Sequence, residues 1–483
     1  MYKPSTSALK VKCRCIAAGL IICEHQFTLR RNSLTTLDSQ HSVAVIGAGP
    51  AGLFAARELA GAGLNVALIN RDVKPGGLAE YGIYPNKYKM KGGLRKQFRQ
   101  VMAEPGLHYF GNVSVGQEAD LSLDDLRQMG FSAVVVTVGA QGTKWLGLPG
   151  EELQGVYHAK DLVYHYNQLP PFSQQEYAIG KRVILIGLGN VMLDIAHWAV
   201  RTLKVDQVTA VARRGPAEVK FTKKEWMYVA QNLDMDAFET EFSTCVPTLE
   251  KVGQDFDKAR AFILDPIAKS QEPNSDTKFG FDFLANPSKV VGENGQVTAL
   301  EVEETTLEPR DGGGTSAVKT GVTRQIPADT VVFCIGDRVD QDFGLPLDKW
   351  KEFAKHPRPK FPIDDVSYEA YDPEKDEGVE GIFLAGWARE ASSGLVGTAR
   401  KDGTTGAKAA MSYMETLDGG AADAIANLEN KLAALSKPIV RTADWQRLDE
   451  IEVTKAEELG QEEFKFASNE DMFAAMEMLA EEA

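Results

Sequence analysis

The chain has few cysteines and no two of them in a C-x-x-C spacing. Its five cysteines are Cys13, Cys15, Cys23, Cys245 and Cys334. So few thiols argue against a disulfide framework and a redox-active disulfide, and an iron–sulfur cluster needs four well-spaced thiolates. The cysteine usage favours a reducing compartment, and we expect no metal site in this chain.

Long apolar runs and an excess of positive charge are also absent. A membrane-spanning helix needs roughly 18 or more consecutive apolar residues, and the sequence has no such run. The net charge of −15 at pH 7 argues against nucleic acid or an anionic membrane as a partner. With 43% hydrophobic and 25% charged residues among 483, the composition is that of a globular protein of two or three domains.

The N-terminal residues 1–41 differ from the rest because they are basic and carry only two acidic side chains. We predict that this segment is a disordered extension and that the protein is cytoplasmic. The alternative is a mitochondrial presequence, which would place the protein in the mitochondrial matrix.

Two segments read as strand, glycine turn and helix. The first, SVAVIGAGPAGLFAARELAGAGLNVALIN, covers residues 42–70, and the second, KRVILIGLGNVMLDIAHWAVR, covers residues 181–201. The predicted elements around them are strands over residues 43–46, 66–69, 133–140, 182–186 and 208–212, and helices over residues 53–62 and from Asn190. Continuous apolar strands alternating with helices predict α/β architecture with parallel sheets covered on both faces.

The first glycine turn has the G-x-G-x-x-G spacing in Gly47, Gly49 and Gly52. In a strand–turn–helix context this pattern lets the backbone approach a pyrophosphate at a helix N-terminus. Asn70 stands where an acidic residue would hold the ribose hydroxyls. A second glycine loop follows in KPGGLAEYGIYPNKYK, where a flavin could lie, so we expect FAD in this cradle rather than a nicotinamide cofactor.

The second glycine turn, GLGNVM, contains Gly187 and Gly189, with Met192 in place of the third glycine. The strand after its helix is followed by Arg213 and Arg214, near the position of the ribose-binding acid of an NAD site. Two guanidinium groups suit a 2′-phosphate through charge-assisted, bidentate hydrogen bonds. The second cradle therefore predicts NADP(H).

Further elements follow the second cradle. QVTALEVEET, around residues 297–305, predicts an antiparallel strand, and RDGGGTSAV predicts a hairpin tip. ADTVVFCIGD and GIFLAGWARE predict apolar strands that end in glycine, and residues 408–417 and 421–435 predict helices. Ligands of open α/β sheets lie at such carboxyl ends of strands.

Several motifs together resemble one family. RRGPAEVKFTKKE, GWAREASSGLVGT, GNVSVG, LPGEELQGVYHAKDLVYHYNQLP and KPIVRTADWQRLDEIE are similar to segments of adrenodoxin reductase and its bacterial ferredoxin–NADP reductase relatives. The resemblance implies two Rossmann-like, glutathione-reductase-like domains, with the NADP domain inserted into a split FAD domain. The implied parts are an extension (residues 1–41), the first FAD part (42–143), the NADP domain (144–336) and the second FAD part with an acidic C-terminal segment (337–483).

The resemblance also implies the cofactor contacts. For FAD they are Gly47, Gly49, Pro50, Ala51, Gly52, Asn70, Gly77, Leu78, Val115, Gly386, Trp387, Gly394, Leu395 and Val396. For NADP they are Gly187, Gly189, Asn190, Val191, Arg213, Arg214, Glu225 and Gly394. The chain departs from the family where a His would follow an Asp, with Asn86 and Lys87, and where a second Glu would follow Glu225, with Tyr228. Lys87 is a candidate for a charge near the flavin.

The implied activity is that of an FAD-dependent ferredoxin–NADP⁺ reductase with a ferredoxin-like iron–sulfur protein as its partner. An alternative is an NADPH-oxidising subunit of a larger complex, like the glutamate synthase small subunit, which shares both cradles. A third reading is a module that binds FAD without turnover.

A basic stretch, NKYKMKGGLRKQFRQ, is a candidate docking site for an acidic partner. Its cations are Lys87, Lys89, Lys91, Arg95, Lys96 and Arg99, with no acidic residue among them. A positive patch of this kind steers an acidic partner towards the protein.

Overall fold

The computed structural model describes residues 41–478 except 393 and 422. All of these residues belong to one compact unit, residues 37–483. The predicted disordered extension and the alternative presequence lie outside the described residues, apart from His41. Among the described residues, no helix combines the length and the apolar character that crossing a membrane requires.

The first of two large sheets is built around the first glycine turn. Its strands, in spatial order, are β15 (Glu369–Asp372), β16 (Glu377–Leu384), β4 (Ala133–Val136), β1 (Ser42–Ile46), β2 (Asn65–Asn70) and β3 (Leu107–Gly111). The strands from β16 to β3 are parallel, and only β15 is antiparallel to its neighbour. Every residue of β1 and β4 is buried, as expected for a parallel sheet covered on both faces.

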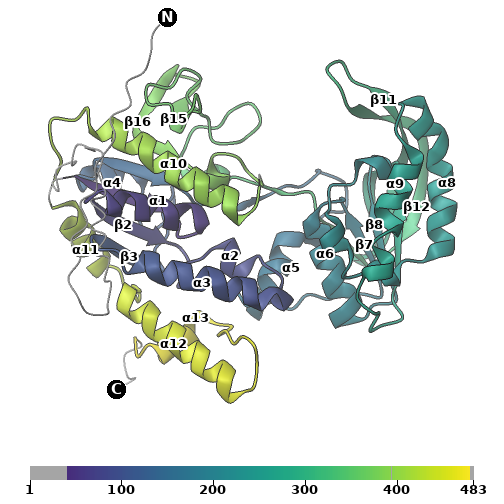
Figure 1. Cartoon of the computed structure of the whole chain (residues 1–483), viewed down its shortest axis with the longest axis horizontal. Helices are drawn as coiled ribbons and strands as arrows, with labels where there is room; N and C mark the ends of the chain where they lie inside the picture. The colour runs from purple at the N-terminus through teal and green to yellow at the C-terminus, as the bar shows by residue number, and fades with distance from the viewer. Residues whose placement is uncertain (1–40, 393, 422, 479–483) are drawn as a thin grey trace, which may run out of the picture. The chain divides into compact units, whose positions relative to one another are not determined.

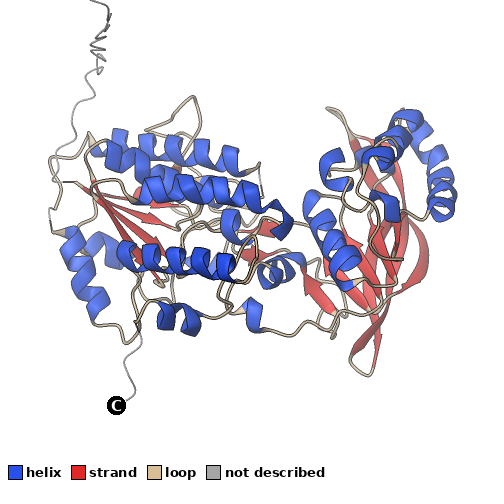
Figure 2. Cartoon of the chain, turned by 60° about the horizontal axis from the view of Figure 1, so that its bottom comes forward, coloured by secondary structure: helices blue, strands red, loops and turns tan. Residues whose placement is uncertain are grey.

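Helices cover the two faces of the first sheet (Figure 2). One core is shared by α1 (Pro50–Gly61), α3 (Tyr88–Met102), α10 (Val396–Met414), α12 (Thr442–Glu458) and α13 (Asn469–Ala475). The other core contains α4 (Leu123–Gln128) and α11 (Ala424–Ala433). The short helix α2 (Leu78–Tyr81) lies next to α3 (Figure 1).

The second large sheet is built around the second glycine turn and is parallel throughout. Its strands, in spatial order, are β6 (Val156–His158), β13 (Thr330–Phe333), β7 (Arg182–Ile186), β8 (Gln207–Val211) and β9 (Lys278–Asp282). Its helices are α5 (Ala159–Tyr166), α6 (Asn190–His197), α7 (Lys223–Trp226), α8 (Met235–Lys251) and α9 (Phe256–Leu264). An antiparallel sheet of β10 (Ala285–Glu293), β11 (Gln296–Pro309) and β12 (Thr315–Pro327) is attached to it.

The residues of the second sheet lie between β4 and β15 of the first sheet in the sequence. The chain leaves the first sheet through β5 (Gly142–Thr143) and returns through β14 (Asp337–Arg338), and these two strands pair with each other. One Rossmann-like domain is therefore inserted into another, and the predicted fold class is confirmed.

Two element predictions were wrong in extent. The strand predicted over residues 133–140 ends at Val136, because the chain leaves the sheet at Thr137, whose hydroxyl donates to the carbonyl oxygens of Ile46 and Gly47 at 2.8 Å. The helix predicted from residue 408 begins at Val396. The first half of this helix contains many polar residues and glycines, so the apolar pattern that predicts a helix begins only in its second half.

Candidate dinucleotide-binding cleft

The first glycine turn has the geometry that a bound pyrophosphate requires. Gly47 has φ of +97°, and a Cβ there would lie 2.7 Å from the carbonyl oxygen of Thr137, so only glycine fits. A Cβ on Gly49, in contrast, would meet nothing within 4 Å, so space is open beside the turn. The helix α1 starts at Pro50 without a side-chain cap, which leaves its first N–H groups available to an anion.

Asn70 lies at the end of β2, but its side chain is used to hold the first glycine turn. Its Oδ1 accepts the N–H of Ala48 at 3.0 Å, and its Nδ2 donates to the carbonyl oxygens of Asp72 at 2.8 Å and Lys74 at 3.0 Å. The hydroxyl of Tyr109 lies 3.3 Å from the same Nδ2. Asn70 therefore ties the glycine turn to the loop after β2.

The second glycine turn repeats the geometry of the first. Gly187 has φ of +125°, and a Cβ there would lie 2.5 Å from the carbonyl oxygen of Cys334. A Cβ on Gly189 would meet nothing within 4 Å, and α6 begins at Asn190 without a side-chain cap. The Oδ1 of Asn190 accepts the N–H of Thr222 at 2.8 Å, which fixes the loop after β8 against this turn.

The two arginines after β8 differ in whether they are ion-paired. Arg214 donates to Glu218 at 2.7 Å, whereas Arg213 is exposed and has no ion pair with any described residue. Glu218 also accepts hydrogen bonds from Thr315 and from Gln254. Although burial opposes the effect, these hydrogen bonds and the charge of Arg214 lower the pKa of Glu218. Arg213 is thus the cation available to a 2′-phosphate, and Arg214 is partly neutralised.

A third helix N-terminus, that of α10, faces the same region as the other two. It has no side-chain cap either, and Gly394, Leu395 and Val396 lie at its start. Further along α10, Asp402 accepts the N–H of Gly386 at 2.6 Å and pairs with Arg389 at 2.6 Å. These contacts fix the segment that carries Trp387 next to α10.

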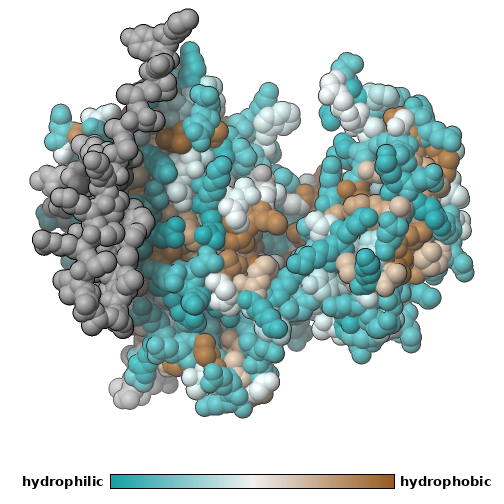
Figure 3. Space-filling model, viewed as in Figure 1, coloured by the Kyte–Doolittle hydropathy of each residue, from teal (hydrophilic) through white to brown (hydrophobic). Residues whose placement is uncertain are grey.

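Most of the predicted cofactor residues line one continuous cavity of about 1150 Å³. On this face of the molecule, apolar side chains gather between the right-hand end of α10 and the helices α5 and α6 (Figure 3). The predicted residues that line the cavity are Gly47, Gly49, Pro50, Ala51, Asn70, Gly77, Leu78, Val115, Gly187, Gly189, Asn190, Val191, Arg213, Arg214, Trp387, Gly394, Leu395 and Val396. Both glycine cradles therefore open into the same space.

Three predicted residues, Gly52, Gly386 and Glu225, are not among those lining the cavity. A Cβ on Gly52 would lie 1.8 Å from the carbonyl oxygen of Gly47. Gly52 therefore allows α1 to pack closely against the end of β1. Gly386 is buried against Ala51, and Glu225 is engaged in the ion pair described below.

Comparisons with known proteins agree with this geometry. Residues 41–246 match the family described as pyridine nucleotide-disulphide oxidoreductase. NADPH-ferredoxin reductase FprA of Mycobacterium leprae is 29% identical over 471 residues, which cover 88% of this chain and 96% of that protein. The mitochondrial NADPH:adrenodoxin oxidoreductase of Arabidopsis thaliana is 28% identical over 389 residues, covering 74% of this chain and 78% of the relative.

A solved structure has the same fold over nearly the whole chain. FprA from Mycobacterium tuberculosis in complex with NADPH gives a TM-score of 0.75 at 26% identity, covering 90% of this chain and 99% of that one. Over most of its length the chain is similar to reductases of the adrenodoxin-reductase type. The resemblance suggested by the sequence motifs is confirmed.

Two departures from the pattern of the adrenodoxin-reductase type lie close together in the structure. The Nζ of Lys87 is 5.9 Å from the centre of the Tyr228 ring. Lys87 also pairs with Glu225 at 2.7 Å and with Asp194 at 3.5 Å, and only Asp194 of these residues lines the cavity. Burial raises the pKa of Asp194 to about 6, against the opposing charge of Lys87. Lys87 thus joins the segment before α3 to α6 and α7.

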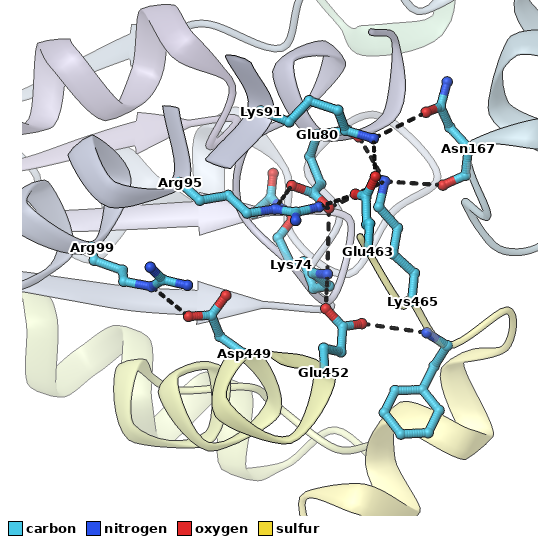
Figure 4. Close-up of polar contacts among 12 residues, drawn as sticks. Lys74, Glu80, Lys91, Arg95, Arg99, Asn167, Asp449, Glu452, Glu463 and Lys465 are labelled. Carbon is cyan, nitrogen blue, oxygen red and sulfur yellow. Dashed lines mark hydrogen bonds and ion pairs between the residues drawn. The ribbon is translucent and has the colours of Figure 1, made fainter. Parts of the chain in front are cut away.

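The basic docking patch predicted from the sequence is largely neutralised within the chain (Figure 4). Lys91 is 1% exposed and pairs with Glu463 at 2.9 Å. Arg95 pairs with Glu80 at 2.5 Å and also with Glu463, and Arg99 pairs with Asp449 at 2.5 Å. Because Lys87 is paired as well, the prediction of a free patch was wrong for four of its six cations, and only Lys89 and Lys96 stay exposed without an ion pair to a described residue.

Two of the carboxylates that pair with cations of α3 come from the acidic C-terminal segment. Asp449 and Glu452 lie on α12, and Glu463 follows it in the chain. Glu452 pairs with buried Lys74, and Lys465 pairs with Glu80 at 3.2 Å and donates to the carbonyl oxygen of Asn167 at 3.2 Å. Burial lowers the pKa of Lys465 to about 7. The C-terminal segment therefore covers the basic face of α3, a pairing that the sequence alone did not indicate.

Sequence reasoning missed a group of polar residues at the cavity wall near Ser392. The Nδ1 of His158 is 3.8 Å from Oδ1 of Asp337, whose N–H donates to the hydroxyl of Ser392 at 3.1 Å. Burial raises the pKa of Asp337 to about 6 and lowers that of His158 to about 4. Asp337 directly follows Gly336 at the end of a predicted apolar strand, so its place could have been found from the sequence, whereas no pattern singled out His158.

Proposed function

We propose that the protein is an FAD-dependent NADPH–ferredoxin reductase. In the forward direction, one NADPH and two oxidised ferredoxins give NADP⁺, one proton and two reduced ferredoxins. When bound, FAD supplies the conversion of a two-electron hydride into two single electrons. The named relatives, an NADPH-ferredoxin reductase and an NADPH:adrenodoxin oxidoreductase, support this reaction class.

One observation carries the proposal: two glycine cradles, each with an uncapped helix behind it, open into a single cavity. The open space beside Gly49 and Gly189 fits a pyrophosphate at each cradle. Hydride transfer requires the two reacting rings to be held about 3–3.5 Å apart, which a shared cavity permits.

The residues of the chain then have separate tasks. The N–H groups at the start of α1 would hold the FAD pyrophosphate, and those at the start of α6 would hold that of NADPH. Arg213 would select the 2′-phosphate by a charge-assisted hydrogen bond. Trp387 and Leu395, which line the cavity between the two cradles, would exclude water from the reacting rings. The N-terminus of α10 would favour negative charge on a neighbouring ring.

The test begins with the purified full chain and its flavin content. We expect a yellow protein with one FAD, which bleaches with anaerobic NADPH much faster than with NADH and then reduces ferricyanide and ferredoxin. A protein that stays colourless when supplied with FAD would contradict the cofactor assignment. A flavoprotein that NADPH does not bleach would instead indicate FAD binding without turnover.

A further inference from the structure

The mouth of the shared cavity carries an exposed aromatic side chain on a tight turn. Trp350 lines the cavity and is 74% exposed, so it stands at the entrance rather than inside. It is flanked by Lys349 and Lys351, which are exposed and have no ion pair with any described residue. Lys349 Nζ lies 5.2 Å from the centre of the Trp350 ring.

The turn is a well-defined hairpin. Leu347 and Phe353 form an antiparallel bridge, and the N–H of Asp348 donates to the carbonyl oxygen of Glu352 at 2.8 Å. Lys351 has φ of +61°, and its N–H donates to the carbonyl oxygen of Asp348 at 2.9 Å. A turn closed by a residue in the left-handed region is a common three-residue hairpin connection, normally with glycine there. Here Lys351 takes the position that glycine normally occupies and closes the turn.

Asp348 accepts backbone N–H groups of the hairpin itself, and Glu352 lies near cations of the cavity wall. Asp348 Oδ1 accepts the N–H groups of Trp350 at 2.8 Å and Glu352 at 3.0 Å. Glu352 Oε2 is buried, and Lys144 and Arg338 at the cavity wall lie close enough to affect its ionisation. The segment around the tip is rich in cations, since residues 349–360 contain five cations and one carboxylate, of which Arg358 pairs with Asp376 and Lys355 donates to the carbonyl oxygen of Arg389.

We propose that the hairpin tip, Lys349–Trp350–Lys351, is the docking element for an acidic iron–sulfur protein. The proposal rests on the reductase function proposed above, because an acidic one-electron acceptor is what that function requires. A tryptophan with flanking cations is typical of the residues that dominate binding energy at interfaces, and opposite charges speed the encounter. Most cations of the stretch 86–100 are paired within the chain, whereas Lys349 and Lys351 have no ion pair with a described residue, so the tip offers free positive charge beside the cavity.

The test compares charge-reversed variants of the holoenzyme with an acidic two-iron ferredoxin as the probe. We expect K349E/K351E to raise the KM for this ferredoxin roughly tenfold, to weaken its binding in calorimetry and to flatten the dependence of kcat/KM on salt. W350A should weaken ferredoxin binding to a similar extent. In K349E/K351E, whose lysines do not line the cavity, FAD content, the KM for NADPH and NADPH–ferricyanide turnover should stay within about twofold of the wild type.

The matched control is K251E/K269E, which reverses two exposed lysines that have no ion pair with a described residue. It should leave ferredoxin binding unchanged. If K349E/K351E behaves like this control, the hairpin is not the docking element. If W350A lowers FAD content or raises the KM for NADPH with ferredoxin binding intact, Trp350 covers the nucleotides and the proposal is overturned. A wild-type enzyme that reduces ferricyanide but neither binds nor reduces ferredoxin would refute the partner itself.

Discussion

Lys91 Nζ lies 2.9 Å from Oε2 of Glu463, a residue 372 positions further along the chain. Lys91 is 1% exposed, so its charge is not available to a partner. Asn167 Oδ1 lies 3.4 Å from the same nitrogen. The cation of α3 that the sequence suggested for docking is instead a structural link to the C-terminal segment.

Charge reversal at Lys91 should therefore act on stability. K91E would place a third carboxylate beside Glu463 and Glu80, and disrupting a buried ion pair typically costs about 3–5 kcal/mol. We expect a lower thermal unfolding temperature and early release of flavin, both followed by fluorescence. K96E is the matched control on the same helix, because Lys96 is exposed and has no ion pair with a described residue. Equal unfolding temperatures for the two variants would contradict a structural role for Lys91.

Arg213 and Arg214 should contribute unequally to NADPH selection. A hydrogen bond to a charged group contributes roughly 1.5–3 kcal/mol, so R213A should raise the KM for NADPH about 10- to 100-fold and leave that for NADH unchanged. R214A should have a smaller effect, because Glu218 already holds Arg214 at 2.7 Å. E218Q should lower the KM for NADPH by a few-fold, since it frees Arg214. Identical effects of R213A and R214A would show that the ion pair does not restrain Arg214.

We expect Asn70 to be needed for flavin retention, because its hydrogen bonds keep the first glycine turn in shape. N70A would leave the N–H of Ala48 and two carbonyl oxygens without their partner, at about 1–3 kcal/mol for each buried group left unsatisfied. We expect a weaker Kd for FAD, roughly tenfold or more, measured by titrating the apoprotein. The Kd for NADP⁺ serves as the internal control, because the second cradle is built from other residues. An unchanged FAD affinity would mean that the turn keeps its shape without Asn70.

His197 should make the protein less stable in mild acid. It is buried between the rings of Tyr84 and Tyr228, at 4.1 Å and 4.9 Å between ring centres. Burial, with help from the charges of Arg201 and Lys87, lowers the pKa of His197 to about 3 from an ordinary 6.5. Above pH 6.5 the histidine is neutral in both states. Below pH 6.5 the unfolded chain takes up a proton that the folded protein does not. The free energy of unfolding therefore falls by about 1.4 kcal/mol per pH unit.

The measurement is the unfolding temperature between pH 7 and pH 5 for the wild type, H197F and H108N. H197F should show a shallower loss of stability with falling pH. H108N, which changes an exposed histidine, should follow the wild type. Comparing variants at each pH cancels other titrating groups, among them Asp194, whose raised pKa acts in the opposite direction. A wild-type slope in H197F would show that His197 titrates freely.

Local patterns were sufficient to predict the two cradles. Gly47 and Gly187 precede helices in unbroken apolar contexts, and their spacing reflects steric demands within a few residues. The arginines after β8 could also be found, because parallel strands bring their carboxyl ends to one edge of a sheet. The docking patch was predicted incorrectly for the opposite reason: Glu463 and Asp449, which pair with three of its cations, lie 350 to 372 residues away in the sequence.

The sequence by itself determined the α/β class, the two strand–turn–helix cradles and the family, since these depend on hydrophobic periodicity and on short-range backbone geometry. Only the tertiary structure decided which charges are free. Lys91 and Arg95 look the same in the sequence as Lys96, but packing α12 and the segment after it against α3 places the first two beside carboxylates and buries Lys91. The fold also placed Trp350 at the cavity mouth, because a charge or a ring acquires its role from neighbours that folding brings together.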